Sequence, residues 1–284
     1  MLSSSSRLLR VLSLLQTRSH WSGQDLAERL AVNPRTLRRD IDRLRQYMRE
    51  SVKAEDDLVA VLQSAKNRPS PIDGYFGSVY YIGPIFTAFR GTPEATNYYR
   101  TLRAEIEQRV RDGKGPITPD GEMGEEKYRL VIEGPPNWTH FRDFWKMFYD
   151  EGAVVVASTY SKVGGLYDFG FRHDPDHPLE SLAEYCLGCY TNLNLPSRVD
   201  MICKYIDEYQ ADGLLINSIK SCNSFSAGQL LIMREVEKRT GKPAAFIETD
   251  LVDPRYFSAA NVKNRLESYF QMVKAKRGAL AAAH

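Results

Sequence analysis

Residues 213 to 229 read GLLINSIKSCNSFSAGQ, and this stretch decides the fold. Its apolar run, Leu214 to Ile216, is long enough for a buried strand and too short for a helix. A polar turn follows the run, and then the helical pattern of Leu230 to Lys238 begins. Ligands of open α/β sheets collect beyond the carboxyl ends of the strands, so Cys222 falls where such a fold places its chemistry.

Three further apolar runs have the length of a strand, and helical patterns separate them. They are Arg129 to Ile132, Ala153 to Ala157 and Ala244 to Ile247. Strands that alternate with helices predict an α/β fold, in which a parallel sheet is flanked by helices on both faces. The chain carries neither a GxGxxG fingerprint nor a Walker loop. We therefore expect a Rossmann-like sheet without an ordinary dinucleotide or ATP site.

Composition indicates a soluble globular protein with a basic N-terminal segment. The 284 residues are 43% hydrophobic and 26% charged, which argues against disorder and against a fibrous class. Residues 1–49 contain ten arginines and four acidic residues, a net charge of +6, which leaves −4 on the remaining residues. A basic segment joined to a mildly acidic body suggests two partners, one of them polyanionic.

The N-terminal segment has the pattern of three short helices, expected at Arg7 to Gln16, Gln24 to Leu30, and Pro34 to Leu44 or beyond. Ser22 and Asn33 stand at the cap positions of the second and third helices. A helix, a tight turn and an arginine-rich helix are the plan of a helix-turn-helix, whose last helix enters a DNA groove.

The stretch LAERLAVNPRTLRRDIDRLR, residues 26–45, resembles the winged helix-turn-helix of bacterial regulators of the DeoR and WYL type. By that resemblance Arg35, Thr36, Arg38 and Arg39 would contact duplex DNA, with the arginines on phosphates or guanine edges. The alternative is that these arginines form a solvated helix face. A Gly-rich turn and a β-wing should follow Leu44 in those regulators, whereas here the helical pattern continues.

These patterns divide the chain into three parts. Residues 1–45 form the helix-turn-helix segment. Residues 46–126 form a helical linker region, which ends in a stretch rich in Gly, Pro and acidic residues. Residues 127–284 form the α/β domain. The opening residues lack the pattern of a signal peptide or of a membrane span, so we expect a cytoplasmic protein.

Four cysteines lie close together in the sequence, and reduced thiols of this kind suggest metal binding, redox chemistry or buried packing. Cys222 is a candidate nucleophile or metal ligand, and the nucleophile role would need a base such as His173 or His177. The alternative is that both histidines are surface-loop residues without a chemical role. The remaining thiols are Cys186 and Cys189, which have CxxC spacing, and Cys203, whose helical position predicts a core residue.

Polar side chains follow the first and last predicted strands. Asn137 and Trp138 come after Arg129 to Ile132, and Glu248 and Asp250 come after Ala244 to Ile247. The carboxyl ends of parallel strands meet at one edge of the sheet, so these side chains should lie near the Cys222 turn. They are the candidate substrate-binding residues.

Four long phrases carry a second resemblance. From about Gln46 to Gly278 the chain resembles the catalytic subunits of ATP-dependent benzoyl-CoA reductases, within the family of 2-hydroxyacyl-CoA dehydratases. The phrases are EGPPNWTHFRDFWKMFYDEGAVVVAS (133–158), LAEYCLGCYTN (182–192), ADGLLINSIKSCNSFSAGQ (211–229) and GKPAAFIETDLVDPRYFS (241–258).

This resemblance implies an iron–sulfur cluster held by cysteines, with Cys222 at the position of a cluster cysteine and Cys186 and Cys189 as further candidate ligands. It also implies an acyl-CoA substrate, a companion reductase subunit, and separate ATP-hydrolysing subunits that donate low-potential electrons. Members of that family begin with another α/β domain that supplies further cluster cysteines. This chain has no cysteine before Cys186.

Two functions follow from these observations. The first is an iron–sulfur oxidoreductase subunit of the benzoyl-CoA reductase type, or a truncated form of one. The alternative is a transcriptional regulator, in which the reductase-like body senses a CoA ester and the N-terminal helices bind DNA.

Overall fold

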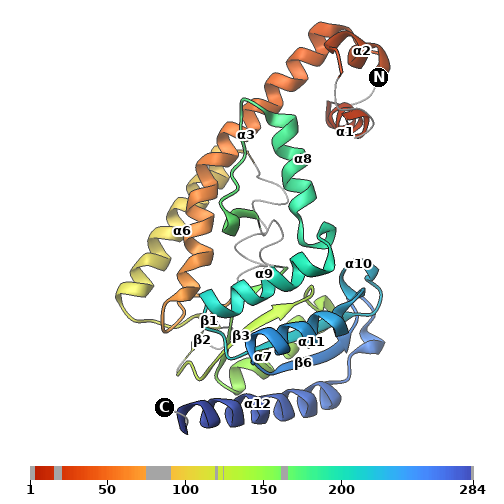
Figure 1. Cartoon of the computed structure of the whole chain (residues 1–284). Coiled ribbons are helices and arrows are strands. Elements are labelled where there is room, and N and C mark those ends of the chain that lie inside the picture. Colours follow the sequence, from red (N-terminus) through yellow and green to blue (C-terminus); the bar gives the residue numbers. More distant parts are fainter. Residues whose placement is uncertain are drawn as a thin grey trace.

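The computed structural model describes residues 4–15, 21–74, 91–118, 121–123, 125–160 and 166–282. Helices and strands alternate from residue 128 onward (Figure 1). The α-helices are α1 (Ser4–Leu15), α2 (Gly23–Arg29), α3 (Pro34–Gln63), α6 (Pro93–Arg111), α7 (Phe141–Asp150), α8 (Pro178–Gly188), α9 (Leu195–Glu208), α10 (Asn223–Ser226), α11 (Gln229–Thr240) and α12 (Ala259–Ala282).

Six strands and five 3-10 helices complete the described part of the chain. The strands are β1 (Ile117–Thr118), β2 (Gly121–Glu122), β3 (Tyr128–Glu133), β4 (Ala153–Ser158), β5 (Gly213–Ile219) and β6 (Ala244–Thr249). The 3-10 helices are η1 (Ser64–Lys66), η3 (Trp138–His140), η4 (Leu166–Phe169), η5 (Tyr190–Asn192) and η6 (Pro254–Tyr256).

The predicted α/β fold is confirmed. Four strands form one parallel sheet in the order β4-β3-β5-β6, so the strand predicted from Leu214 to Ile216 lies at its centre. All seven residues of β5 are buried. Alternate side chains of the sheet serve two cores, because successive side chains of a strand point to opposite faces. Helices α7 and α12 cover one face, and α9 and α11 cover the other.

A glycine opens β5 because its neighbours leave no space for a side chain. A Cβ atom at Gly213 would lie 2.3 Å from the Tyr269 hydroxyl oxygen of α12 and 2.7 Å from the Pro243 carbonyl oxygen. Both distances are far below van der Waals contact, so the start of β5 tolerates glycine alone.

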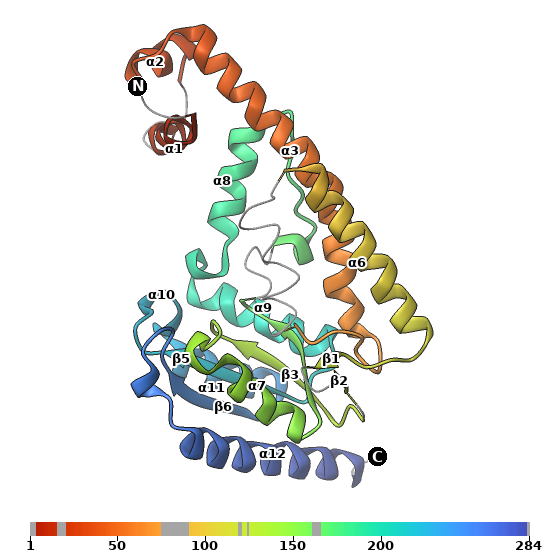
Figure 2. The same ribbon diagram turned by 180° about the vertical axis from the view of Figure 1, so that it is seen from behind.

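Helices α3 and α6 lie side by side and lead away from the sheet, with α1 and α2 at the far end (Figures 1 and 2). Helix α3 has 30 residues and is therefore about 45 Å long. It joins the third predicted helix to the helix expected after Arg45 without a break. The predicted boundary between residues 45 and 46 thus falls inside a single helix.

The three N-terminal helices have a small core of their own. Val11, Leu26, Leu30 and Leu37 are among its buried side chains. The predicted caps are confirmed, since the Ser22 side chain accepts a hydrogen bond from the Asp25 amide and Asn33 accepts one from the Thr36 amide.

The stretch rich in Gly, Pro and acidic residues that ends the predicted linker region contains the two short antiparallel strands β1 and β2. Hydrophobic periodicity does not reveal strands of two residues. Among the described residues, no helix is both long enough and apolar enough to cross a membrane.

Residues 70–74 cover the outer edge of the sheet. Among the described strands, β4 pairs with β3 only. Asp73 is 3% exposed, and its carboxylate accepts hydrogen bonds from the Val155 amide of β4 at 2.8 Å and from the Trp145 indole of α7 at 3.1 Å. This carboxylate satisfies an amide on the side of β4 that faces away from β3, where a sheet edge needs hydrogen-bond partners.

We expect Asp73→Ala to lower the free energy of unfolding by about 2 to 4 kcal/mol, because two buried N–H groups lose their acceptor. Urea denaturation followed by circular dichroism measures the change. Asp42→Ala removes a carboxylate whose side chain is 59% exposed and should change the free energy by less than about 0.5 kcal/mol. Equal losses in the two variants would contradict the role of Asp73.

Candidate functional site

The carboxyl ends of the four parallel strands form a buried polar layer. Each of these strands is largely apolar, yet polar side chains without exposed surface lie near its carboxyl end or in the loop that follows. They are Glu133, Asn137, Ser158, Thr159, Asn217 and Thr249. Buried polar groups are costly unless they are hydrogen-bonded, so such a concentration marks this edge as the candidate site.

Asn217 of the central strand links its two neighbours at this edge. Its amide donates to the Pro135 carbonyl oxygen at 2.7 Å, and its own oxygen accepts from the Thr249 hydroxyl at 2.9 Å. The turn after β3 comes so close that a Cβ atom at Gly134 would lie 2.1 Å from the Asn217 carbonyl oxygen. With a φ of +111°, Gly134 is the residue type that this turn requires.

Asn137 and Trp138, predicted to bind substrate, follow this turn. The Asn137 oxygen accepts from the Thr139 hydroxyl at 2.8 Å, whereas its amide nitrogen is buried and has no hydrogen-bond partner among the described residues. Trp138 is 41% exposed and stacks on Phe141, with the ring centroids 5.7 Å apart. The pair therefore presents one unsatisfied donor and one exposed aromatic ring.

Glu248 and Asp250, the other two predicted substrate residues, make contacts within the chain. Glu248 forms an exposed ion pair with Lys220, at 3.0 Å, and this contact raises the pKa of Lys220. Asp250 accepts hydrogen bonds from the amides of Asp253, Val252 and Ser221. Those of Asp253 and Val252 are the main causes that lower the pKa of Asp250. Asp250 thus anchors the turn that carries Cys222.

The structure places Cys222 where the sequence analysis expected it, in the turn between β5 and α10, and leaves it partly exposed. Cys186 is exposed and Cys189 is half-buried at the end of α8. Cys203 lies in the core, as predicted, and burial raises the pKa of its thiol.

These thiols do not by themselves make a metal centre. Within the part of the chain that the structure describes, no three His, Cys, Asp or Glu side chains are grouped closely enough to hold a metal ion. The predicted ligands Cys186, Cys189 and Cys222 therefore do not amount to a complete site here.

The two histidines occupy different environments, so the expectation that both lie at the surface is wrong for His173. His173 is 3% exposed, and its imidazole contacts Glu55 of α3, which is also buried. The Tyr167 hydroxyl donates to the same carboxylate at 3.1 Å. His177 is exposed and paired with Asp174, which raises the pKa of His177. No hydrogen bond among the described residues joins either histidine to the Cys222 thiol.

Glu133 is a site residue that the sequence analysis missed. It ends β3 with no exposed surface, and its carboxylate accepts hydrogen bonds from the Tyr190 hydroxyl at 3.1 Å and from the Gln229 amide. Burial raises the pKa of Glu133 to about 7, although both hydrogen bonds oppose this shift. The available signal was a carboxylate directly after the apolar run of β3, just before Gly134.

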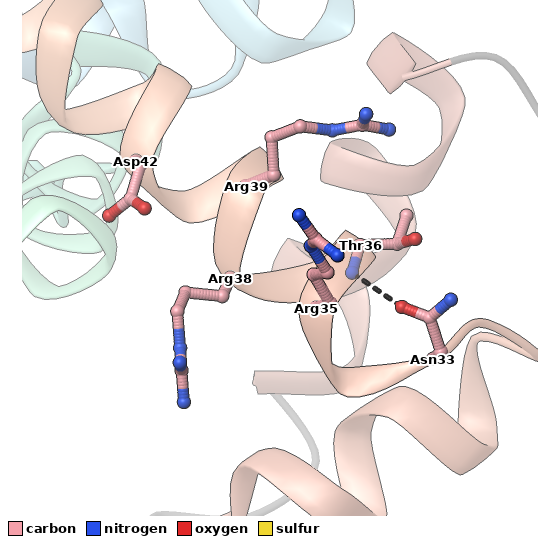
Figure 3. A pocket seen from close by; sticks show the side chains of 6 residues that line it. All are labelled: Asn33, Arg35, Thr36, Arg38, Arg39 and Asp42. Atoms are coloured by element: carbon pink, nitrogen blue, oxygen red, sulfur yellow. Dashed lines mark hydrogen bonds between the residues drawn. The ribbon is translucent and has the colours of Figure 1, made fainter.

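The predicted DNA-contacting residues lie together at the start of α3, far from this edge (Figure 1). Figure 3 shows that the side chains of Arg38 and Arg39 extend from the helix in different directions. The surrounding depression has a volume of about 480 Å³ and is lined by Asn33, Arg35, Thr36, Arg38, Arg39 and Asp42. Arg35 is three residues from Arg38 and four residues from Arg39. Such spacings place side chains on one face of any helix, whether or not it binds DNA. DNA contact by these residues stays a prediction.

Comparison with known proteins identifies the family. A family model described as 2-hydroxyglutaryl-CoA dehydratase, D-component, matches residues 25–273. The chain belongs to this family. Its matched region begins in α2 and includes all of α3, and hence the arginine-rich helix face.

Curated relatives in this dehydratase family agree with the match. A benzoyl-CoA reductase subunit from Thauera aromatica is 79% identical over 244 residues, which are 86% of this chain and 56% of the relative. The (R)-phenyllactyl-CoA dehydratase alpha subunit of Clostridium sporogenes is 25% identical over 84% of this chain and 55% of the relative. The chain thus spans about half the length of these relatives, and they lend the DNA-binding alternative no support.

Glu133 should make the stability of the fold depend on pH. Its folded pKa lies above its ordinary value of 4.5, so between these values the folded state binds more protons than the unfolded state. The free energy of unfolding should therefore fall as the pH rises through this window, by on the order of 3 kcal/mol. Urea denaturation of the wild type and of Glu133→Gln between pH 4.5 and 7.5 measures this loss, which the variant should lack.

Glu107→Gln is the control for this measurement, because the Glu107 side chain is 49% exposed. Its stability difference from the wild type should stay nearly constant across the pH range. A difference between the wild type and Glu133→Gln that is independent of pH would contradict the assignment of the titration to Glu133.

Proposed function

We propose that this chain is part of a benzoyl-CoA reductase-type subunit, which acts on an aromatic acyl-CoA thioester within a complex. The observation that carries the proposal is the 79% identity to the benzoyl-CoA reductase chain of Thauera aromatica over 86% of this chain. Several relatives are named as subunits, which supports a companion reductase subunit as a partner. ATP-hydrolysing subunits that donate low-potential electrons in the cytoplasm belong to the same proposal.

The proposal assigns the chemistry to the carboxyl edge of residues 127–284, the predicted α/β domain. The described helices α1, α2, α3 and α6 then form an arm beside it, and they belong to the predicted N-terminal segment and the predicted linker region. The buried polar layer and the partly exposed Cys222 support this assignment, because catalytic groups of parallel sheets lie at this edge.

Asn137 and Trp138 are the proposed substrate contacts. The unsatisfied amide of Asn137 is a donor that fits a thioester carbonyl oxygen, and a buried donor without an acceptor costs about 1 to 3 kcal/mol. The exposed indole of Trp138 offers a flat apolar surface for an aromatic ring. We assign Glu248 and Asp250 a supporting role around the site, since Lys220 and backbone amides already occupy their carboxylates.

An iron–sulfur cluster needs thiolate ligands, and the described part of this chain does not gather enough of them. We propose that Cys222 supplies one ligand, because it stands at the sheet edge with part of its surface exposed. Cys186 and Cys189 are further candidates, since their spacing allows two sulfurs to share one metal ion. The remaining ligands would come from a companion subunit or from protein outside the described residues.

The test is iron binding by the assembled complex. We expect the chain, produced with its companion subunits and purified without oxygen, to contain iron and acid-labile sulfide and to reduce benzoyl-CoA when the ATP-dependent donor is added. Cys222→Ser should lower the iron content at least about twofold, because replacing a cluster cysteine weakens its metal centre. Iron and sulfide assays with the visible absorption spectrum measure this.

Cys203→Ser is the matched control, because it removes a thiol from the core and not from the sheet edge. It should keep the iron content of the wild-type complex. Full iron content in Cys222→Ser would show that Cys222 is not a ligand. A complex that contains no iron and does not reduce benzoyl-CoA would overturn the proposed function.

A further inference from the structure

Glu133 connects two segments that carry cysteines. One of its carboxylate oxygens accepts from the hydroxyl of Tyr190, the residue directly after Cys189. The other accepts from the side chain of Gln229, the first residue of α11, which follows Cys222 and α10. A single buried carboxylate of β3 therefore joins η5, which directly follows Cys189, to the start of α11.

A ring contact repeats this connection. Tyr190 stacks on Phe225 of α10, three residues after Cys222, with the ring centroids 5.8 Å apart and an interplanar angle of 27°. Arg198 of α9 places its guanidinium 5.0 Å from the centre of the Tyr190 ring and donates to the Thr191 carbonyl oxygen at 2.7 Å. Tyr190 is thus held from three sides and is 1% exposed.

The Gln229 side of the connection is equally constrained. Gly228 has a φ of +81°, and a Cβ atom there would lie 2.4 Å from a methyl carbon of Leu195, the first residue of α9. Gln229 itself is 1% exposed, and its side-chain oxygen has no hydrogen-bond partner among the described residues. The hydrogen bond from its side-chain nitrogen to Glu133 is thus the one side-chain hydrogen bond that Gln229 makes among the described residues.

We propose that Glu133 is a positioning residue, which holds the Cys189 segment and the Cys222 segment in a fixed relation through Tyr190 and Gln229. This role rests on the proposed function, in which both thiols are candidate ligands at one site. Glu133 acts on the two thiols through the two side chains that it binds.

Alkylation by a bulky maleimide, mapped cysteine by cysteine by mass spectrometry, tests this on the metal-free chain of 284 residues. Such a reagent reacts faster with a partly covered thiol when the segment that carries the thiol moves. Glu133→Ala should speed alkylation of both Cys189 and Cys222 about tenfold, since it removes two buried hydrogen bonds. Glu133→Gln should stay near the wild-type rates, because Gln229 can rotate its amide and accept from the new one with its unused oxygen.

Two further variants each break one arm of the connection. Tyr190→Phe keeps the ring but removes the hydroxyl, and it should speed alkylation of Cys189 without changing Cys222. Gln229→Leu removes the other hydrogen bond, and it should speed alkylation of Cys222 without changing Cys189. These variants keep the inference testable if Glu133→Ala does not fold.

The remaining cysteines are internal controls. Exposed Cys186 should react quickly and buried Cys203 slowly in every variant. Unchanged rates at Cys189 and Cys222 in all three disrupting variants would overturn the inference, as would a parallel rise at Cys203, which reports unfolding of the whole chain. Because no iron is involved, this test can succeed where the iron-binding test of the proposed function fails, and the reverse.

Discussion

Polar groups that leave water must find hydrogen-bond partners, and this requirement organises the carboxyl edge of the sheet. Three of the four largely apolar strands end there in polar residues without exposed surface, and the fourth, β5, carries buried Asn217 near its end. Asn217 satisfies part of this layer by binding Pro135 on one side and Thr249 on the other. Glu133 satisfies another part by binding two segments that are distant in the sequence. The relative positions of the loops at this edge follow from these few bonds.

The groups that remain unsatisfied are therefore informative. The Asn137 amide nitrogen and the Gln229 side-chain oxygen are buried without a partner in the described part of the chain, although the groups around them are paired. Asn137 lies in the loop after β3 and Gln229 begins α11, both at the carboxyl edge of the sheet, where ligands of such folds bind. Trp138 adds an exposed ring there, and Cys222 adds a thiol. An edge with unused hydrogen-bonding capacity is consistent with a ligand or with further protein that completes it.

Local sequence patterns were enough to predict the sheet and the position of Cys222. Apolar runs such as Leu214 to Ile216 mark buried strands, and the side chains after them must fall at the carboxyl edge. Those patterns could not reveal Glu133, because its role depends on Tyr190 and Gln229, which are 57 and 96 residues away. The contact of His173 with Glu55 spans 118 residues and was missed for the same reason.

Helix α3 runs without a break from the N-terminal helices toward the sheet (Figure 1). The arginines at its start and Glu55, the 22nd of its 30 residues, belong to the same helix. Glu55 in turn binds His173, which precedes the helix that carries Cys186 and the neighbouring Cys189. One continuous helix therefore joins the arginine-rich face to the side chain that holds the segment before α8.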